Sequence, residues 1–387
     1  MKIAVIGGGA SGIAAAITAA RQGAYVTLYE QSDRIGKKIL ASGNGRCNLS
    51  HKNMSGKFYN APEYVDGIYK LVPPSEINEF FKSIGIITYA DGEGRIYPVT
   101  DQSSTILDCL RNELNRLKVR IVTDSPQKVT DYLPLVIEYD FVILASGGIA
   151  GKNGAYNNPL KELGHTATEV YPSLVPLVTD KKWLKAMNGV RVDAKLTIAD
   201  HRSPSTVHQE KGEVLFRDYG ISGIAVFNIS AYMARHAGES GRYGGVIKME
   251  LLPNIKKSDL IILLADRLKN LTENSEEFFT GLLNKNLSAI ICDELGLTHR
   301  RISENDIELI AELMKGIYIN VYKPKEFLYA QVMAGGIRLT EMDTVRSRLN
   351  DKLFVTGEAL NVDGLCGGYN LHFAWASGIL AGKLCTS

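Results

Sequence analysis

The sequence predicts an α/β fold in which both ends of the chain build one parallel-sheet domain, while the middle supplies a β-rich insert and a helical insert. Three observations support this prediction. A strand, a glycine turn, a helix and a second strand follow one another within the first thirty residues. A strand, a glycine-rich turn and a helix also end the chain, and helical periodicity replaces short strands near residue 256. Apolar strands that alternate with helices are typical of parallel sheets.

The composition is that of an ordinary globular protein, with 387 residues of which 45% are apolar and 22% charged. A net charge of +2 without a long Lys/Arg run argues against a nucleic-acid partner. The five cysteines form no C-x-x-C pair and the seven histidines lack metal-ligand spacing, so we expect reduced thiols, a cytoplasmic protein and no metal. Residues 3–20 carry no charge, but three glycines interrupt them, so we expect neither a signal peptide nor a membrane anchor. The sequence indicates no oligomeric state.

The first strand, KIAVI at residues 2–6, leads into a turn that is typical of dinucleotide binding. In this turn Gly7 permits the tight bend, Gly9 lets the backbone approach a pyrophosphate, and Gly12 lets the helix pack close to the strand. Ala10 and Ser11 begin the helix, whose free N–H groups and dipole attract phosphate. The whole strand–turn–helix–strand context makes this pattern far more specific than an isolated G-x-G-x-x-G.

The second strand, YVTLY at residues 25–29, ends at Glu30, 18 residues after Gly12. At this position a carboxylate accepts hydrogen bonds from ribose hydroxyls, and Gln31 directly follows it. An acid here repels the 2′-phosphate of NADP, so the site fits FAD or NAD.

A long loop after the second strand favours FAD. Lys37 and Lys38 precede a stretch rich in glycine, asparagine and serine at residues 41–48. Backbone N–H groups and lysines of such a loop can follow an extended anionic cofactor, whose bulky flavin end needs a second binding segment. The alternative is an exposed flexible loop with solvated lysines.

The end of the chain supplies the other half of the expected Rossmann-type FAD-binding domain. The strand KLFVT at 352–356 ends in Gly357-Glu358, and a glycine-rich turn precedes a helix at about 371–384. The N-terminus of that helix suits the N1/C2=O edge of a reduced flavin, where negative charge gathers. A third strand ends at Ala145 and is followed by a further glycine turn that contains Gly147.

Strand and helix patterns divide the chain into three parts. We expect the FAD domain at 1–165 and 340–387, a β-rich substrate domain at 166–255 with 317–339, and a helical insert at 256–316. The sequence contains no second G-x-G-x-x-G fingerprint. Reducing equivalents therefore come from the substrate, from NAD(P)H that docks transiently at the flavin, or from a partner.

These motifs together resemble the BaiN/YhiN-like flavoproteins, a family that includes aminoacetone-oxidase-like members and a proposed bile-acid C=C reductase. The matching segments are GGGASG (7–12), KKILASGNGRCNLS (37–50), GRIYPVT (94–100), GEVLFRDYGISG (212–223), AGGI (334–337) and VTGEALNVDGLCGGYNLHFAWASG (355–378). The resemblance implies non-covalently bound FAD, held by a domain that a β-rich insert and a helical insert split.

The resemblance also implies roles for individual residues. It assigns Glu30 to the adenosine ribose. It assigns to the pyrophosphate and flavin Lys38 and the loop residues Ser42, Gly43, Asn44, Gly45, Arg46, Cys47 and Asn48. It assigns to the ribityl chain and flavin ring Gly357, Glu358, Gly368, Tyr369 and Asn370. The chain departs from the family at 150–159, where many members have a Ser/Pro/Gly/Thr-rich stretch with an acid, so no member's substrate is carried over.

The sequence identifies no certain catalytic acid or base, and Arg46, Tyr97, Tyr369 and His372 are the candidates. Arg46 either holds a phosphate or substrate carboxylate or anchors its loop through a salt bridge. His372, near a helix start, more often packs or is exposed than catalyses. Cys47 and Cys366 could form a redox-active pair, but a role as small, packed loop residues is favoured.

The predicted function is an FAD-dependent oxidoreductase that moves a hydride between flavin N5 and a small, largely apolar organic substrate. Reduction of an activated C=C, as in an oxo-steroid, is one version that the resemblance implies. The alternatives are an amine or aminoketone oxidase that uses O₂ and produces H₂O₂, a flavin-dependent tRNA-modifying protein, and a flavin-binding protein without turnover.

Overall fold

The computed structural model describes residues 1–125, 132–151, 164–199, 207–241, 243–270 and 275–387. The chain divides into two compact units, of which the first comprises Met1–Tyr171 with Gln331–Ser387 and the second Pro172–Ala330. Each unit has its own hydrophobic core. The three-part division predicted from the sequence, with changes at 165/166, 255/256, 316/317 and 339/340, stays a prediction.

A seven-stranded sheet forms the centre of the first unit, in the order β16-β17-β18-β7-β1-β2-β6. In its middle, β1 (Lys2–Ile6) pairs in parallel with β2 (Tyr25–Tyr29) and β7 (Phe141–Leu144). The C-terminal strand β18 (Leu353–Val355) pairs in parallel with β7, which confirms that both ends of the chain build one sheet. The remaining strands are parallel β6 (Arg120–Val122) and the antiparallel edge of β17 (Arg346–Ser347) and β16 (Met342–Asp343).

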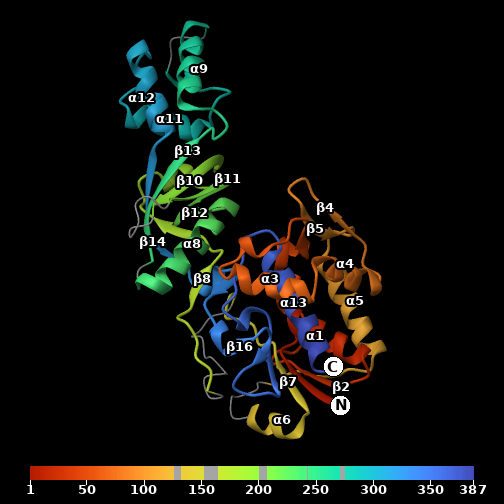
Figure 1. Cartoon of the computed structure of the whole chain (residues 1–387). Helices are drawn as coiled ribbons and strands as arrows, with labels where there is room; N and C mark the ends of the chain where they lie inside the picture. The colour runs from red at the N-terminus through yellow and green to blue at the C-terminus, as the bar shows by residue number, and fades with distance from the viewer. Residues whose placement is uncertain (126–131, 152–163, 200–206, 242, 271–274) are drawn as a thin grey trace. The chain divides into compact units, whose positions relative to one another are not determined.

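The helices that follow the two glycine turns, α1 (Ala10–Arg21) and α13 (Tyr369–Leu384), lie side by side (Figure 1). Small residues permit this contact, because a Cβ on Gly378 would lie 2.2 Å from the carbonyl oxygen of Ser11. A Cβ on Gly382 would lie 2.7 Å from the carbonyl oxygen of Ala15. Helix α1 also contacts β1, β2 and β7. It therefore packs on the sheet on one side and against α13 on another.

Short elements complete the first unit. A three-stranded antiparallel sheet has the order β3-β5-β4, and its strand β3 begins shortly after the 42–48 loop. Its strands are β3 (Ser50–His51), β4 (Thr88–Ala90) and β5 (Arg95–Pro98). The other helices are α2 (Lys37–Ala41), α3 (Pro62–Leu71), α4 (Pro74–Ser83), α5 (Ser103–Arg116) and α6 (Tyr132–Glu138), with 3₁₀ turns at Ser42–Gly45, Gly56–Phe58, Leu339–Glu341 and Gly357–Ala359.

The second unit contains a closed barrel with the strand order β10-β11-β12-β9-β14-β13. Its strands are β9 (Leu177–Thr179), β10 (Arg191–Ala199), β11 (Val207–Arg217), β12 (Gly220–Ser222), β13 (Gly245–Leu251) and β14 (Ile317–Pro324). A helix that the sequence interpretation missed, α8 (Ile224–Ser240), packs against β11. It is buried on most of its surface and carries apolar or small residues nearly all round, so it lacks the one-sided pattern that predicts a helix.

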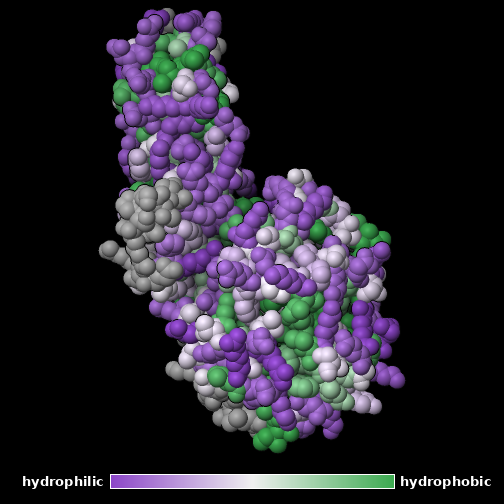
Figure 2. Space-filling model, in the orientation of Figure 1, coloured by the Kyte–Doolittle hydropathy of each residue, from purple (hydrophilic) through white to green (hydrophobic). Residues whose placement is uncertain are grey.

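Four helices follow β13 and precede β14 along the chain, as expected from the helical pattern. They are α9 (Lys257–Asn270), α10 (Ser275–Phe278), α11 (Lys285–Glu294) and α12 (Glu304–Met314). Figure 2 shows hydrophobic residues at the end that carries α9 and α12, where Ile262 and Leu309 are 61% and 53% exposed. The shorter elements of the second unit are α7 (Leu184–Met187) and a 3₁₀ turn at Phe327–Tyr329. Two further short strands of the chain are β8 (Tyr171–Ser173) and β15 (Val332–Ala334). Among the described helices, none combines the length and apolar character that a bilayer crossing requires.

Candidate functional site

The turn between β1 and α1 makes the close contacts that its glycine pattern predicts. A Cβ on Gly12 would lie 1.9 Å from the carbonyl oxygen of Gly7, and one on Gly7 would lie 2.2 Å from the carbonyl oxygen of Ala145. A Cβ on Gly9 would meet no atom within 4 Å. Two of the glycines are therefore required for packing, whereas the third leaves open space beside the first turn of α1. A phosphate can approach the N–H groups of that turn through this space.

Glu30 directly follows β2, and two backbone groups fix its carboxylate. The N–H of Gly8 donates to Oε2 at 2.8 Å, and the N–H of Ser32 donates to Oε1 at 2.8 Å. Each carboxylate oxygen keeps a further lone pair. Glu30 is therefore oriented by the backbone and can still accept hydrogen bonds from ribose hydroxyls. Gln31 is exposed beside it.

Glu358, in the 3₁₀ turn that follows β18, connects three segments of the first unit. Its Oε2 accepts a hydrogen bond from Lys38 Nζ at 2.7 Å and from the Gly148 N–H at 3.1 Å. Its Oε1 accepts from the Met333 N–H at 2.7 Å. The Lys38 side chain is 46% exposed. The structure thus brings Lys38, Gly147 and Glu358, all predicted as binding residues, to the same place, and it pairs the lysine with the glutamate.

The 42–48 loop has an unusual backbone. Left-handed φ angles of +54° to +85° occur at Gly43, Asn44, Gly45 and Cys47. This conformation costs free energy at residues other than glycine, and such strain is common at functional sites. Hydrogen bonds hold the loop in this shape, including Cys47 N–H to Ser42 O at 3.1 Å. A Cβ on Gly43 would lie only 2.7 Å from the backbone nitrogen of Asn48, so this turn also requires its glycine.

The N-terminus of α13 meets the end of the same loop. Gly368 precedes the helix with φ +96°, and a Cβ there would lie 2.5 Å from the carbonyl oxygen of Ser50 and 2.7 Å from Asn48 Oδ1. Among the described residues, Asn48 Oδ1 is buried without a hydrogen-bond partner. Asn370 shapes the turn, because its side-chain amide binds both the N–H and the carbonyl oxygen of Gly364, at 2.8 and 2.9 Å. The predicted flavin-binding segments of the two chain ends therefore lie in contact.

Aromatic side chains surround Tyr369, the first residue of α13. Its ring stacks on His51 and Phe58, with ring centres 5.0 and 4.6 Å apart. The Tyr59 hydroxyl donates to the carbonyl oxygen of Tyr369 at 2.7 Å and lies 2.6 Å from the Tyr69 hydroxyl. Sequence reasoning missed these neighbours because they come from a segment without a recognisable motif. These ring contacts and the Tyr59 hydrogen bond hold the N-terminus of α13 in place.

His372 is fully buried in the first turn of α13. Its Nδ1 lies 2.7 Å from Ser50 Oγ, and among the described residues its Nε2 has no partner. Burial lowers the pKa of this imidazole to about 3, so it is neutral at physiological pH. The contacts are those of a packed structural histidine, the role that the sequence favoured over catalysis.

Arg46 is anchored by residues far away in the sequence. Its Nη2 lies 2.8 Å from Asp101 Oδ1 and 2.6 Å from the Tyr89 hydroxyl, and its guanidinium lies 4.3 Å from the centre of the Tyr97 ring. The structure thus gives Arg46 the salt bridge that was one of two expectations. Tyr89 and Asp101 were not identified from the sequence, because they lie 43 and 55 residues from Arg46 and share no motif with it.

The cysteines near this region are thiols. Burial raises the pKa of Cys47 and that of Cys366 to about 11 each. None of the five cysteines of the chain forms a disulfide. Cys47 is buried and Cys366 is half-buried, and two thiols that stay protonated favour the packing role over a redox-active pair.

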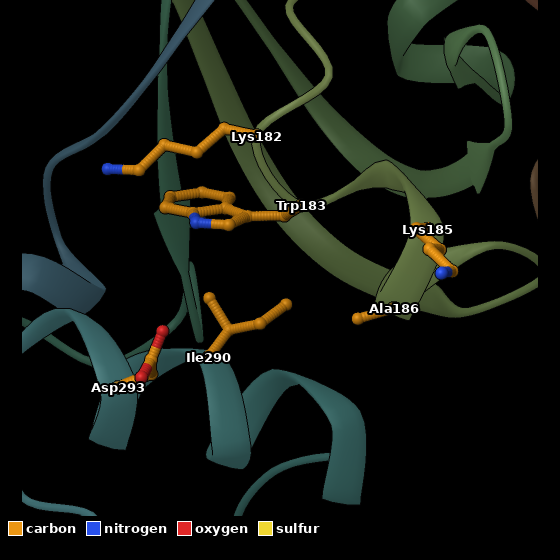
Figure 3. Close-up of a pocket in the computed structure, with 6 residues that line it drawn as sticks. All are labelled: Lys182, Trp183, Lys185, Ala186, Ile290 and Asp293. Carbon is orange, nitrogen blue, oxygen red and sulfur yellow. The ribbon is translucent and has the colours of Figure 1, made fainter.

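Among the residues that the structure describes, the other parts of the chain add no second candidate. The 150–159 loop, where the chain departs from the family, lies outside the described residues from 152 to 159. Within the described residues, no group of three His, Cys, Asp or Glu side chains can hold a metal ion. A hollow of about 460 Å³ between α7 and α11 of the second unit contains none of the predicted site residues (Figure 3). Its lining residues are Lys182, Trp183, Lys185, Ala186, Ile290 and Asp293.

Comparison with known proteins identifies relatives over nearly the whole chain. A family model described as HI0933-like protein Rossmann domain matches residues 1–384. The chain is 38% identical over 412 residues to the 3-dehydro-bile acid delta(4,6)-reductase of Clostridium scindens, covering 99% of this chain and 98% of that protein. It is 23% identical over 398 residues to the ribosomal RNA dihydrouridine synthase of Escherichia coli, covering 96% and 95%. A 3-ketosteroid-delta4-(5alpha)-dehydrogenase from Rhodococcus jostii has a similar structure at 14% identity and a TM-score of 0.43, covering 100% and 96%.

The residues at both chain ends fit an FAD molecule. The open space at Gly9, the oriented carboxylate of Glu30 and the glycine turn before α13 supply a phosphate site, a ribose acceptor and a second helix N-terminus. The expected fold class, the FAD cofactor and the oxidoreductase activity are confirmed together with the resemblance that implied them. The chain belongs to the HI0933-like Rossmann family.

Proposed function

We propose that this protein reduces a carbon–carbon double bond conjugated to a carbonyl group, in a small and largely apolar substrate such as a 3-oxo bile acid. One observation carries the proposal: the 38% identity to the 3-dehydro-bile acid delta(4,6)-reductase extends over 99% of this chain and 98% of that protein. The similarity therefore includes both chain ends and the inserts between them.

The geometry of the first unit supports a role in holding FAD for this reaction. The N-terminus of α1 beside Gly9 would receive the pyrophosphate, and Glu30 the adenosine ribose. Glu358 would face the ribityl chain, and the N-terminus of α13 would stabilise negative charge on the flavin ring. When bound, FAD supplies hydride transfer at N5. The protein supplies position, a water-poor surface and fixed dipoles.

The electron donor in this proposal is NAD(P)H that docks transiently. The sequence has one G-x-G-x-x-G fingerprint, and Glu30 and the turn before α1 serve FAD. The nicotinamide therefore needs no dinucleotide domain of its own and approaches the flavin from the substrate side. The partner in turnover is a small molecule and not a nucleic acid.

Anaerobic stopped-flow spectroscopy tests the proposal. NADH or NADPH should bleach the flavin absorbance, and a 3-oxo-4,6-diene steroid should restore it and lose a double bond, as mass spectrometry will show. Slow reoxidation by O₂ is expected. Bleaching by an amine with rapid return in O₂ would support the oxidase alternative and overturn the reductase.

Reduction of uracil in RNA is a second candidate. The ribosomal RNA dihydrouridine synthase of Escherichia coli is 23% identical over 96% of this chain. Reduction of uridine to dihydrouridine also saturates a double bond conjugated to a carbonyl, so both relatives use the same kind of chemistry. A net charge of +2 favours the small molecule. Salt-dependent RNA binding with formation of dihydrouridine would reverse this order.

A further inference from the structure

We propose that Arg46 binds the carbonyl oxygen of the substrate and stabilises the negative charge that develops there during reduction. This inference rests on the proposed function and adds a catalytic residue to it. Arg46 belongs to the strained 42–48 loop, between the left-handed residues Gly45 and Cys47. Strain of this kind persists only where the surrounding structure holds it.

Arg46 lies near the meeting point of the two chain ends. Its guanidinium covers the ring of Tyr97 at 4.3 Å. Two residues after Arg46 in the same loop, Asn48 Oδ1 lies 2.7 Å from the position of a Cβ on Gly368. Gly368 is the residue that directly precedes α13. Arg46 thus belongs to the loop that contacts the N-terminus of α13, and both segments are proposed to bind the flavin.

One side of the guanidinium is held rigidly. Nε and Nη2 donate to Asp101 Oδ1 at 3.1 and 2.8 Å, and Nη2 donates to the Tyr89 hydroxyl at 2.6 Å. The Tyr89 hydroxyl in turn donates to Asp101 Oδ1 at 2.8 Å. These residues position Arg46 and do not themselves need to touch the substrate. A planar cation that is fixed along one edge points its other edge in a defined direction.

The other side of the guanidinium is open to a ligand. Within the described part of the chain, no protein atom accepts a hydrogen bond from Nη1 of Arg46. The Arg46 side chain is 42% exposed. Both N–H groups of Nη1 are therefore donors without a protein acceptor, and they sit on a residue that is charged at every physiological pH.

The chemistry of the proposed reaction needs such a group. A hydride from the reduced cofactor bonds to the β-carbon, and the electron pair of the double bond moves toward the carbonyl oxygen, which gives an enolate. A proton from water then bonds to the α-carbon, and the enolate returns to a ketone. Because the oxygen gains charge only as the hydride is transferred, a preorganised cation stabilises the transition state more than the bound ketone.

A phenolate is a suitable probe, because it presents an oxygen anion on a planar ring and cannot be reduced. We expect the FAD-loaded protein to bind 4-nitrophenol as its anion, so that equilibrium dialysis across pH gives a lowered apparent pKa for the bound phenol. Loss of a charge-assisted hydrogen bond in Arg46→Gln should weaken phenolate binding by about tenfold to a hundredfold. Arg46→Lys should restore part of this affinity. Flavin absorbance after gel filtration shows whether each variant still holds FAD.

Arg95→Gln is the matched control. Arg95 carries the same charge on strand β5 of the small sheet, but Asp91 and Glu93 occupy its guanidinium at 2.8 Å each. Phenolate binding should stay within about twofold of the wild type in this variant, because the two carboxylates already compensate the charge of Arg95. Asp101→Asn is a second test if Arg46→Gln loses FAD, because it keeps Arg46 and removes its anchor. It should weaken phenolate binding severalfold.

The outcomes separate this inference from the proposed function. Equal phenolate affinity in the wild type and in an FAD-loaded Arg46→Gln or Asp101→Asn variant overturns the inference, even if the protein reduces enones. Arg46-dependent phenolate binding in a protein that reduces no enone supports the oxyanion site and overturns the proposed function. A wild type that binds no phenolate at any pH also overturns the inference.

Discussion

Two glycine turns lead into neighbouring helices of the first unit, and they differ in what surrounds them. Before α1, a Cβ on Gly9 would meet nothing within 4 Å. Before α13, a Cβ on Gly368 would collide with Ser50 and Asn48. Neither helix has a side-chain cap at this end. The same local motif can thus form an open anion site in one place and an enclosed joint in another.

The two turns differ because their partners lie at different distances along the sequence. The open turn is made mainly by residues 7–12 and Glu30, and its distant partner is Ala145, against which Gly7 packs. The enclosed turn is made with partners that lie more than 300 residues away, as in the Tyr59–Tyr369 and Ser50–His372 hydrogen bonds. Local sequence therefore determines the first site, while tertiary structure determines the second.

The largest expected effect comes from filling the enclosed turn. Gly368→Ala adds a left-handed alanine and a collision 2.5 Å from a carbonyl oxygen. Strain and overpacking together should lower the free energy of unfolding by about 3–5 kcal/mol. In a Trp183→Phe background, Trp375 is the only tryptophan and reports urea unfolding of the first unit.

Gly45→Ala is the control for Gly368→Ala. Gly45 also has a left-handed φ of +85°, but a Cβ there meets nothing within 4 Å. It should cost about 1–2 kcal/mol, from backbone strain alone. Equal losses in the two variants would mean that enclosure by Ser50 and Asn48 does not contribute, and the contrast between the two turns would fail.

Acid should weaken the enclosed turn and leave the open one unchanged. His372 lies in the first turn of α13, where burial lowers its pKa to about 3, while the first turn of α1 contains no titratable side chain. The unfolded chain binds a proton below pH 6.5 and the folded chain does not, so the stability present above pH 6.5 is lost as the pH falls. The loss at pH 5 should reach about 2 kcal/mol.

Urea unfolding of the wild type and of His372→Gln at pH 7 and pH 5 measures this loss. The variant lacks the titrating group, so its stability should change less between the two pH values than that of the wild type. An identical pH dependence in both proteins would contradict the assignment of a neutral, buried imidazole.

At the open turn before α1, a substitution should change the stability of the protein little and should weaken FAD binding. Gly9→Ala places a methyl group where a phosphate would approach, without a collision in the protein. The free energy of unfolding of the apoprotein should change by less than about 1 kcal/mol. FAD affinity, measured by flavin fluorescence on titration, should fall by about tenfold, because the methyl group separates the cofactor from the N–H groups of α1. Unchanged affinity would remove the phosphate from this position.

The same contrast explains how far the sequence predicted the site. The turn at Gly7, Gly9 and Gly12 and the acid at Glu30 follow from a pattern within thirty residues. That both chain ends build one sheet also followed, since their apolar strands have similar flanking turns, whereas the pairing of β18 with β7 was not predicted. The partners of Arg46 and of Glu358 did not follow either, because Asp101, Tyr89 and Met333 lie outside the recognised motifs. Only the folded chain brings these polar groups together.

Helix α8 was missed for a related reason. Its buried residues include Asn228, Ser230 and several alanines, so it is neither one-sided nor strongly apolar. The strands that bury it are β10, β11 and β12 of the barrel, which precede it in the chain. A periodic pattern on one element predicts that element well only when solvent covers its other face.

The smallest expected effect concerns the thiol beside the enclosed turn. If Cys366 were redox-active, the turns before α13 and before α1 would differ in their chemistry and not only in their packing. Burial raises the pKa of Cys366 to about 11, so only about one thiol in ten thousand is ionised at pH 7, and a thiolate is the reactive form. Cys366→Ser should therefore leave the rate of flavin reduction by NAD(P)H within about twofold, because a protonated thiol acts mainly through packing. Anaerobic stopped-flow measures this rate, with Cys109→Ser, on α5, as a control for the loss of a thiol elsewhere in the same unit. A tenfold slower reduction in Cys366→Ser alone would show that the Cys366 thiol itself takes part in electron transfer to the flavin.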